Sequence, residues 1–340
     1  MDQATLATIW FVIEGVLLTG YAILDGFDLG VGMLHRFVAR SDGERRQVIN
    51  SVGPVWDGNE VWLLTGGGAL FAAFPKVYAT VFSGLYLALM LVLAALILRA
   101  VCLEFRSKLA SPRWRSTWDT VFVVSSFLPS LLFGVAIGNI LRGLPLDPGQ
   151  EFAGTFLGLL NPFALVVGLL SVAMFLTQGA AWLDLKTQGA VRDRARAWAK
   201  GAWLAFALLW LAATLLSRIA IPRLWRAYAH PLAWVAPVLF VLLAARFRML
   251  VGGSRPGRAF AHFSAAIAML LATMGQGLYP DLVPVLGAGE SLTVTNASST
   301  PLTLTVMLVI ALVGMPFVVG YTIFIYRRFR GPVKLDEHSY

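Results

Sequence analysis

Residues 20–34 of the chain read GYAILDGFDLGVGML, and this stretch places two carboxylates, Asp25 and Asp28, inside an apolar run. The whole run, residues 8–34, exceeds the roughly 20 mainly apolar residues that a helix needs to cross a bilayer. A carboxylate that faces lipid is costly, so ionisable groups within a span face protein or water. The stretch therefore predicts a membrane helix with one functional face.

The composition supports an integral membrane protein. Of the 340 residues, 58% are hydrophobic and 13% are charged, and the mean hydropathy is +0.74. A soluble domain is about half apolar and about a quarter charged. The N-terminus lacks the basic segment and small-residue cleavage site of a signal peptide, so we expect the first helix to be retained. We read the net charge of +9 as a sign of helix orientation, and we expect no nucleic-acid partner.

Nine segments are apolar enough to be candidate spans. They are residues 8–34, 56–74, 77–98, 121–141, 156–183, 203–216, 231–244, 260–278 and 302–326. If the N-terminus lies outside, 22 of the 27 lysines and arginines fall on inner segments. Because cytoplasmic loops carry the excess of Lys and Arg, this split predicts nine spans with the N-terminus outside and the C-terminus inside. Residues 39–52 are too polar to cross and are expected to form a short amphipathic helix on the inner surface.

Acidic residues of the first two spans are expected to converge. At about 100° per residue, Glu14, Tyr21, Asp25 and Asp28 share a stripe about 60° wide. The second span begins on the inner side with WDGNE, which brings Asp57 and Glu60 to a similar depth. Such clusters suit a proton relay or a cation site. A structural reading stays open, in which Asp25 and Asp28 cap the helix or pair with Arg36, Arg45 or Arg46.

The sequence predicts no cofactor site within the chain. The four histidines do not form a facing pair within spans, as a transmembrane bis-His haem would need. The single cysteine, Cys102, excludes an intramolecular disulfide and a cysteine-rich cluster. No phosphate-binding loop, zinc motif or serine nucleophile elbow is present. The chain therefore reads as a partner subunit or a transporter.

Several long strings resemble subunit II of the cytochrome bd-type quinol oxidases, including the cyanide-insensitive branch. They are GFDLGVGML, RRQVINSVGPVWDGNEVWLLTGGGALFAAFP, WDTVFVVSSFLPSLLFGVAIGN, LLNPFALVVGLLSV and LTQGAAWL, with NASSTPLTLTVMLVIALVGMPFVVGYTIFIYRRF near the C-terminus. The resemblance implies an all-α fold of two four-helix bundles and a ninth peripheral helix. Within a single membrane domain, 1–340, we expect the bundles at 1–145 and 150–280, the ninth helix at 300–328 and an inner tail at 329–340.

The resemblance also implies the function. Such enzymes are electrogenic, couple quinol oxidation to reduction of oxygen to water, and take protons from the inside. Two b-type haems, one d-type haem and the quinol site belong to subunit I, and subunit II supports haem insertion without binding haem itself. A structural quinone occupies subunit II in some relatives, and a small accessory subunit is a further expected partner. The expected location is the bacterial inner membrane, among its lipids.

Three site residues follow from the match to the family. Asp28 of GFD and Asp57 of WDGN correspond to acidic residues of the family's proton path at the subunit interface. Asp25, Glu60 and Glu14 are further candidates for this path. Trp62 corresponds to a tryptophan near a hydrophobic oxygen channel in some members.

Two other classes of function remain as alternatives. A secondary transporter would use the acidic cluster as a cation site, although such proteins show interrupted mid-membrane helices and inverted repeats. A purely structural assembly partner would use the acids as ties between helices.

Overall fold

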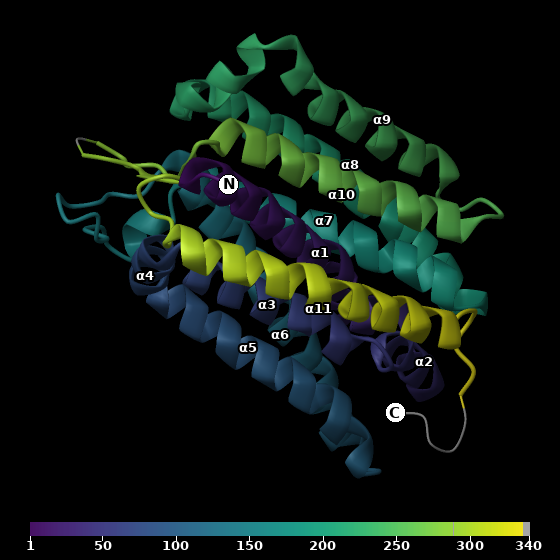
Figure 1. The fold of residues 1–340 in the computed structure, drawn as a ribbon. Helices are drawn as coiled ribbons and strands as arrows, with labels where there is room; N and C mark the ends of the chain where they lie inside the picture. The colour runs from purple at the N-terminus through teal and green to yellow at the C-terminus, as the bar shows by residue number, and fades with distance from the viewer. Residues whose placement is uncertain (288, 336–340) are drawn as a thin grey trace.

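The computed structural model describes residues 1–287 and 289–335 and is mostly helical (Figure 1). The helices are α1 (Gln3–Val38), α2 (Asp42–Val52), α3 (Trp56–Ala73), α4 (Pro75–Gly84), α5 (Tyr86–Phe105), α6 (Pro112–Arg142), α7 (Pro162–Lys186), α8 (Gly189–Ala220), α9 (Val235–Leu250), α10 (Pro256–Leu278) and α11 (Pro301–Arg328). A hairpin of β1 (Asp281–Val283) and β2 (Leu292–Thr293) joins α10 to α11. Of the expected tail 329–340, residues 336–340 lie outside the described residues.

Eight helical segments of the described chain are long and apolar enough to cross a membrane. The expected span 56–74 forms α3, whose 18 residues begin with the polar WDGNE and so carry a weaker apolar signal than the others. The expected span 77–98 is wrong in its bounds. The helix is interrupted at Leu85, where the ring of Phe152 packs against Gly84, and α5 then runs from Tyr86 to Phe105.

Local sequence explains where the helices start. Proline occupies the first turn of α6, α7, α10 and α11, where its missing N–H is no loss. Asn161 caps α7, because its side chain accepts a hydrogen bond from the Ala164 amide. The expected inner amphipathic helix is α2, which begins with a capping box formed by Ser41 and Glu44.

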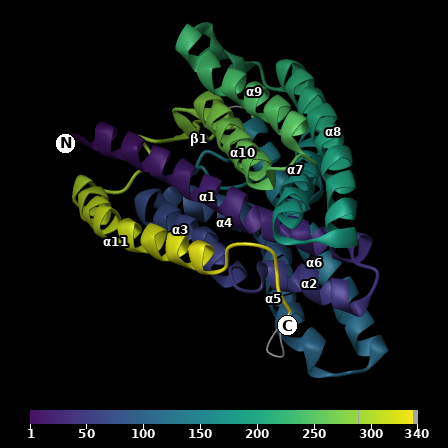
Figure 2. The same cartoon turned by 90° about the vertical axis from the view of Figure 1, so that its right-hand side faces the viewer.

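Helix α1 runs through the centre of the molecule (Figure 2). It packs against α3 and α6 on one side and against α7 and α10 on the other. Helix α11 lies along α1 and α3 at the edge, and most of it is exposed. The larger apolar core surrounds the second half of α1, and a smaller one joins the start of α1 to α4 and the hairpin.

Glycines allow α1 and α7 to touch through their backbones. A Cβ on Gly30 would lie 1.9 Å from the carbonyl oxygen of Phe175, and one on Gly179 would lie 2.4 Å from the Gly30 carbonyl carbon. Small residues at helix crossings permit such close approach in membranes. The two glycines therefore fix how α7 sits on α1.

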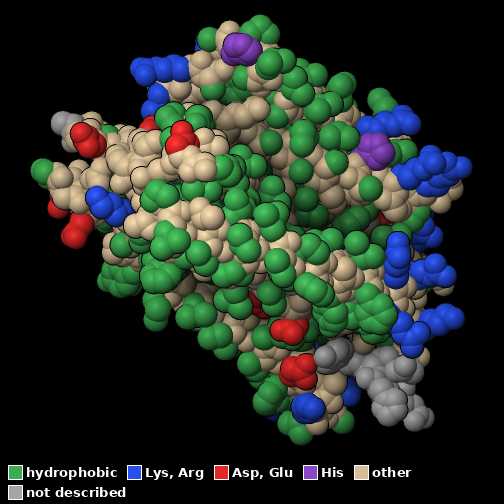
Figure 3. Space-filling model, viewed as in Figure 1, with side chains coloured by type: hydrophobic (Ala, Val, Ile, Leu, Met, Phe, Trp, Pro, Cys, Tyr) green, Lys and Arg blue, Asp and Glu red, His purple; other side chains and the backbone are tan. Residues whose placement is uncertain are grey.

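The surface is apolar over most of the face in view (Figure 3). Basic side chains gather at the end of the molecule where α1 ends, and fewer lie at the opposite end. This distribution is that of a protein whose sides contact lipid or a partner and whose ends contact water.

Adding a methyl group at the α1–α7 crossing should destabilise the protein. We expect Gly30→Ala to lower the free energy of unfolding by about 1–3 kcal/mol, since neither backbone can give way without shifting a helix. The measurement is thermal unfolding of the purified protein with its partner subunit. The matched control is Gly15→Ala on the same helix, where an added Cβ meets nothing within 4 Å. Equal midpoints for the two variants would contradict the role of the crossing.

Candidate functional site

The polar stripe of α1 is buried within the protein. The exposed fractions are 6% for Glu14, 5% for Tyr21, 0% for Asp25 and 2% for Asp28. The neighbouring helices α3, α5 and α6 cover this face and shield it from lipid. The stripe is therefore a protein-lined polar track inside a membrane helix.

Asp25 is held by an arginine from α5. Its Oδ1 accepts a hydrogen bond from Nη2 of Arg99 at 2.6 Å, and the same Nη2 lies 3.4 Å from Oε2 of Glu60 on α3. Arg99 is 1% exposed, so the sequence-based placement of this residue in an inner loop is wrong. A buried ion pair offsets part of the desolvation cost of each partner, so this bridge ties α1, α3 and α5 together.

The expected arginine partners of Asp25 lie elsewhere. Arg45 binds Asp119 on α6, with 3.0 Å between Nη1 and Oδ2, and Arg36 contacts the hydroxyl of Thr120. These arginines lie at or beyond the C-terminal end of α1, which packs against α6, whereas Asp25 faces α5.

Asp28 has a neutral partner instead. Nδ2 of Asn59 donates to its Oδ2 at 2.8 Å and also to the carbonyl of Leu24 at 3.3 Å. The hydroxyl of Tyr326, on α11, donates to Oδ1 of Asn59 at 2.9 Å. The other oxygen of Asp28, Oδ1, is buried and has no hydrogen-bond partner among the described residues. Asp28 thus combines full burial with one uncommitted oxygen.

Asp57 and Glu60 share the start of α3 but not the same surroundings. Asp57 is exposed, and Glu60 is half-buried one turn further along. Asp57 lies close enough to act on Glu60 electrostatically, and Glu60 in turn reaches Arg99. The four carboxylates expected to converge therefore form a chain that runs from the surface at Asp57 to the bridge at Asp25, with Asp28 beside it.

Glu14 lies in the N-terminal half of α1, and Trp62 of α3 packs against the same helix. Gly66 of α3 packs on Glu14, because a Cβ there would lie 3.5 Å from Oε1, and Oε2 has no hydrogen-bond partner within the described chain. The indole of Trp62 lies flat over Gly20, where a Cβ would come within 2.2 Å of Cε3. Among the described residues, neither Glu14 nor Trp62 forms a hydrogen bond with Asp25 or Asp28.

The sequence reasoning missed a second polar centre at the inner end of α1. Asp119 of α6 is fully buried and accepts hydrogen bonds from Nε2 of His35 at 2.6 Å and from Nε of Arg106 at 2.6 Å. Asp184 on α7 is likewise buried and accepts from Arg192 and Arg196, each at 2.8 Å. Both carboxylates are fully committed to basic partners, which is typical of structural ties.

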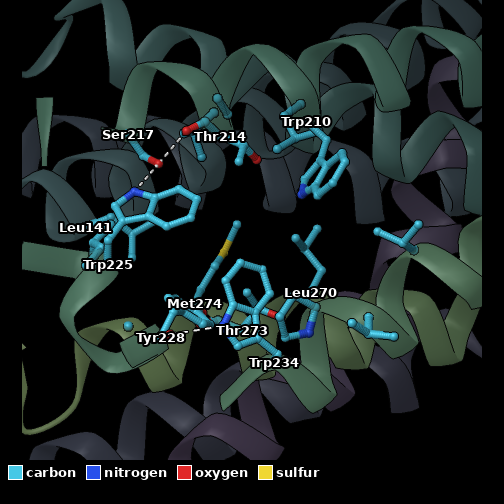
Figure 4. A pocket seen from close by; sticks show the side chains of 18 of the residues that line it. Leu141, Trp210, Thr214, Ser217, Trp225, Tyr228, Trp234, Leu270, Thr273 and Met274 are labelled. Atoms are coloured by element: carbon cyan, nitrogen blue, oxygen red, sulfur yellow. Dashed lines mark hydrogen bonds between the residues drawn. The ribbon is translucent and has the colours of Figure 1, made fainter. Parts of the chain in front are cut away.

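A cavity of about 400 Å³ lies among α7, α8, α9 and α10 (Figure 4). Its polar groups are largely satisfied within the protein: Oγ of Ser217 accepts from Nε1 of Trp225, and the Tyr228 hydroxyl donates to the Thr273 carbonyl. Burial raises the pKa of Tyr228 to about 12, which keeps this hydroxyl a neutral donor. Sequence reasoning did not find this cavity, because its walls come from segments that lie far apart in the chain.

No group of three or more His, Cys, Asp or Glu side chains that could hold a metal ion occurs in residues 1–287 and 289–335. The fold and site thus define a multi-pass membrane protein with a buried carboxylate track.

The comparisons with known proteins give the family. The family model for cytochrome bd terminal oxidase subunit II matches residues 6–329. The chain is 38% identical to cytochrome bd-I ubiquinol oxidase subunit 2 of Escherichia coli K12, over 99% of this chain and 97% of that one. It is 36% identical to cytochrome bd ubiquinol oxidase subunit 2 of Bacillus subtilis 168, over 98% and 99%. The protein belongs to the cytochrome bd terminal oxidase subunit II family.

The fold agrees with a solved structure of the same enzyme class. A chain of the bd oxidase from Geobacillus thermodenitrificans superposes with a TM-score of 0.72, covering 96% of this chain and 99% of that one at 12% identity. The protein is therefore a subunit of a terminal quinol oxidase in the bacterial inner membrane.

Removing Arg99 should cost more than removing an exposed arginine. Arg99→Leu leaves Asp25 buried without its ion partner, and losing one partner of such a pair costs about 3–5 kcal/mol. We expect a low yield of assembled complex and a lowered thermal midpoint, with partial recovery in the double variant Asp25→Asn/Arg99→Leu. The control is Arg246→Leu on the exposed surface of α9. A single variant as stable as the control would contradict a structural role for the bridge.

Proposed function

We propose that this chain guides protons from the inner side of the membrane toward subunit I of the oxidase. The path uses Asp57 and Asp28, with Glu60, Asp25 and Glu14 along it. The observation that carries the proposal is the state of Asp28: it is 2% exposed, an amide holds one oxygen, and no arginine of the described chain forms a salt bridge with it. A carboxyl group of this kind can exist in both protonation states, as a relay requires.

The residues divide the work. Asp57, exposed in the first turn of α3, takes the proton, and Glu60 carries it one turn inward. Asp25 pairs with Arg99 and orients its guanidinium. Asp28 holds the proton at the end of the described track. Glu14, on the same face nearer the outer side, extends the track outward.

The complex supplies the redox chemistry. We propose that two b-type haems and one d-type haem in subunit I carry electrons from quinol to oxygen, as the family resemblance implies. This chain's contribution would be non-haem: proton delivery, support of haem insertion and a packing surface for subunit I. The exposed apolar sides of α3 and α11 are available for subunit I, for a small accessory subunit or for lipid. Trp62, over Gly20, would border the route of oxygen.

We further propose nine spans, with the N-terminus outside and the C-terminus inside. The ninth is α3, whose 18 residues extend about 27 Å at 1.5 Å each. The supporting observations are that 21 of the 27 basic residues lie on the inner segments once the buried Arg99 is left out, and that basic side chains gather at one end in Figure 3. Two four-helix bundles would then be formed by α1, α3, α5 and α6 and by α7 to α10, with α11 outside both.

The cavity in the second bundle fits the structural quinone found in some relatives. Its walls are apolar and aromatic, as a prenylated ring requires, and Trp210 and Tyr228 lie at its edge (Figure 4). A quinone bound there would act as a structural filler between α8 and α9. Among this chain's own residues, Trp210 and Trp234 would hold its ring by stacking.

Filling the cavity should remove this quinone. We expect Ala213→Phe to abolish quinone that co-purifies with the complex, since its ring would occupy the cavity, while turnover with added quinol stays within about twofold. Mass spectrometry of the extracted lipids measures the quinone. The matched control, Leu215→Phe, places the same ring on the exposed face of α8. Equal amounts of co-purifying quinone in the two variants would refute a quinone site in this cavity.

Neutralising Asp57 tests the proton path. We expect Asp57→Asn to slow quinol oxidase turnover by about tenfold, which is less than the loss of an acid–base group at the reaction centre itself. Haem content should stay nearly normal because Asp57 is exposed and makes no buried tie. Asp193→Asn, an exposed carboxylate on α8, is the control. Full turnover in Asp57→Asn would refute the role in proton delivery, and loss of all haem would point to structure.

A further inference from the structure

Helix α11 touches the rest of the chain very little, yet it supplies one of the few hydrogen bonds around Asp28. Only 6% of the most apolar 18-residue stretch of α11 is buried, whereas the Tyr326 side chain turns inward near the C-terminal end of the helix. The ring lies 5.9 Å from that of Trp182 and 6.5 Å from that of Phe27, both edge-to-face. This aromatic contact fixes the ring, so the hydroxyl has little freedom of position.

Three groups hold the Asn59 amide in one orientation: the Tyr326 hydroxyl, the Leu24 carbonyl and the Asp28 carboxylate. A carboxamide has one acceptor oxygen and one NH₂ group with two donors. The Tyr326 hydroxyl donates to Oδ1, and both donors of Nδ2 are then directed to Oδ2 of Asp28 and to the carbonyl of Leu24. The opposite orientation would place Oδ1 of Asn59 against two acceptors, Asp28 and the Leu24 carbonyl, and would turn the Tyr326 hydroxyl from a donor into an acceptor.

The orientation of the amide has a consequence for the proton. With Nδ2 donating, Oδ2 of Asp28 is an acceptor in both protonation states, so the proton binds to Oδ1, which has no other partner in the described chain. With the amide reversed, a protonated Asp28 would donate to Asn59 and the proton would be trapped in that bond. We propose that Tyr326 is a positioning residue for Asp28: through Asn59 it keeps Oδ1 as the oxygen that takes up and releases the proton.

This inference rests on the proposed proton role of Asp28, and one set of variants separates the two. Tyr326→Phe keeps the ring and its packing but removes the hydroxyl. We expect turnover of the intact complex to fall roughly fivefold, as the loss of one net hydrogen bond implies, and the solvent isotope effect on turnover to increase. The matched control is Tyr321→Phe, on the same helix and 63% exposed. Asn59→Leu should reproduce the loss, since it removes the amide and leaves Tyr326 in place.

Infrared difference spectroscopy gives a readout that packing alone would not move. The carboxyl band that disappears in Asp28→Asn belongs to Asp28, and it should shift in Tyr326→Phe but not in Tyr321→Phe. Normal haem content in each variant shows that the complex has assembled.

Each outcome decides a question. An unshifted band with normal turnover in Tyr326→Phe, while Asp28→Asn is slow, overturns the positioning role and leaves the proton path standing. A fivefold loss that persists in the Asp28→Asn background also overturns it, because the effect then does not pass through Asp28. Normal turnover in Asp28→Asn refutes the proton path itself. If Asp28→Asn is too slow for the double variant to be measured, the position of the infrared band decides alone.

Discussion

The arrangement of the helices depends on the carboxylates of α1, which are too costly to place against lipid. A helix that carries Glu14, Asp25 and Asp28 on one side has to be covered on that side by protein. Helix α1 accordingly lies in the centre, and its polar partners come from other helices: Arg99 from α5, Asn59 from α3 and, through Asn59, Tyr326 from α11. The bare backbones at Gly30 and Gly179 then allow α7 to close the opposite side at short range.

The two aspartates of the opening stretch differ because their partners differ. A guanidinium carries a fixed charge, so Arg99 binds the carboxylate of Asp25 in an ion pair that ties the helices together. An amide carries no net charge and can accompany either form of Asp28. Two residues one turn apart on one helix thus have different surroundings: Asp25 lies in an ion pair, and Asp28 lies beside a neutral amide, as the proposed relay requires. The same contrast separates Asp28 from Asp119 and Asp184, each of which has two or more basic partners.

Sequence reasoning found the parts that periodicity and charge control. The apolar runs located most spans, and the polar stripe of α1 appeared on a helical wheel before any neighbour was known. The partners of that stripe were not accessible in this way. Arg99 follows a long apolar run and looked like a loop residue, because nothing local shows that α5 continues to Phe105. Asn59 is two residues from Asp57 in WDGNE, and its role depends on the rotation of α3 against α1, which one sequence does not specify. Asp119 was missed for the same reason, since its basic partners come from α1, α2 and the turn after α5.

Asp57 is exposed and Asp28 is buried, which gives the proposed track a direction. Carboxylates buried side by side repel when both are ionised, and a site built that way would hold its protons tightly. Here the exposed Asp57 can exchange with water, Glu60 is half-buried, and the Arg99 charge stands between Glu60 and the buried aspartates. That cation offsets part of the repulsion between carboxylates that are buried near one another. In the proposed path, protons would enter from one side of the membrane through three elements: a surface acid, a buried cation and the oxygen of Asp28 that has no hydrogen-bond partner in the described chain.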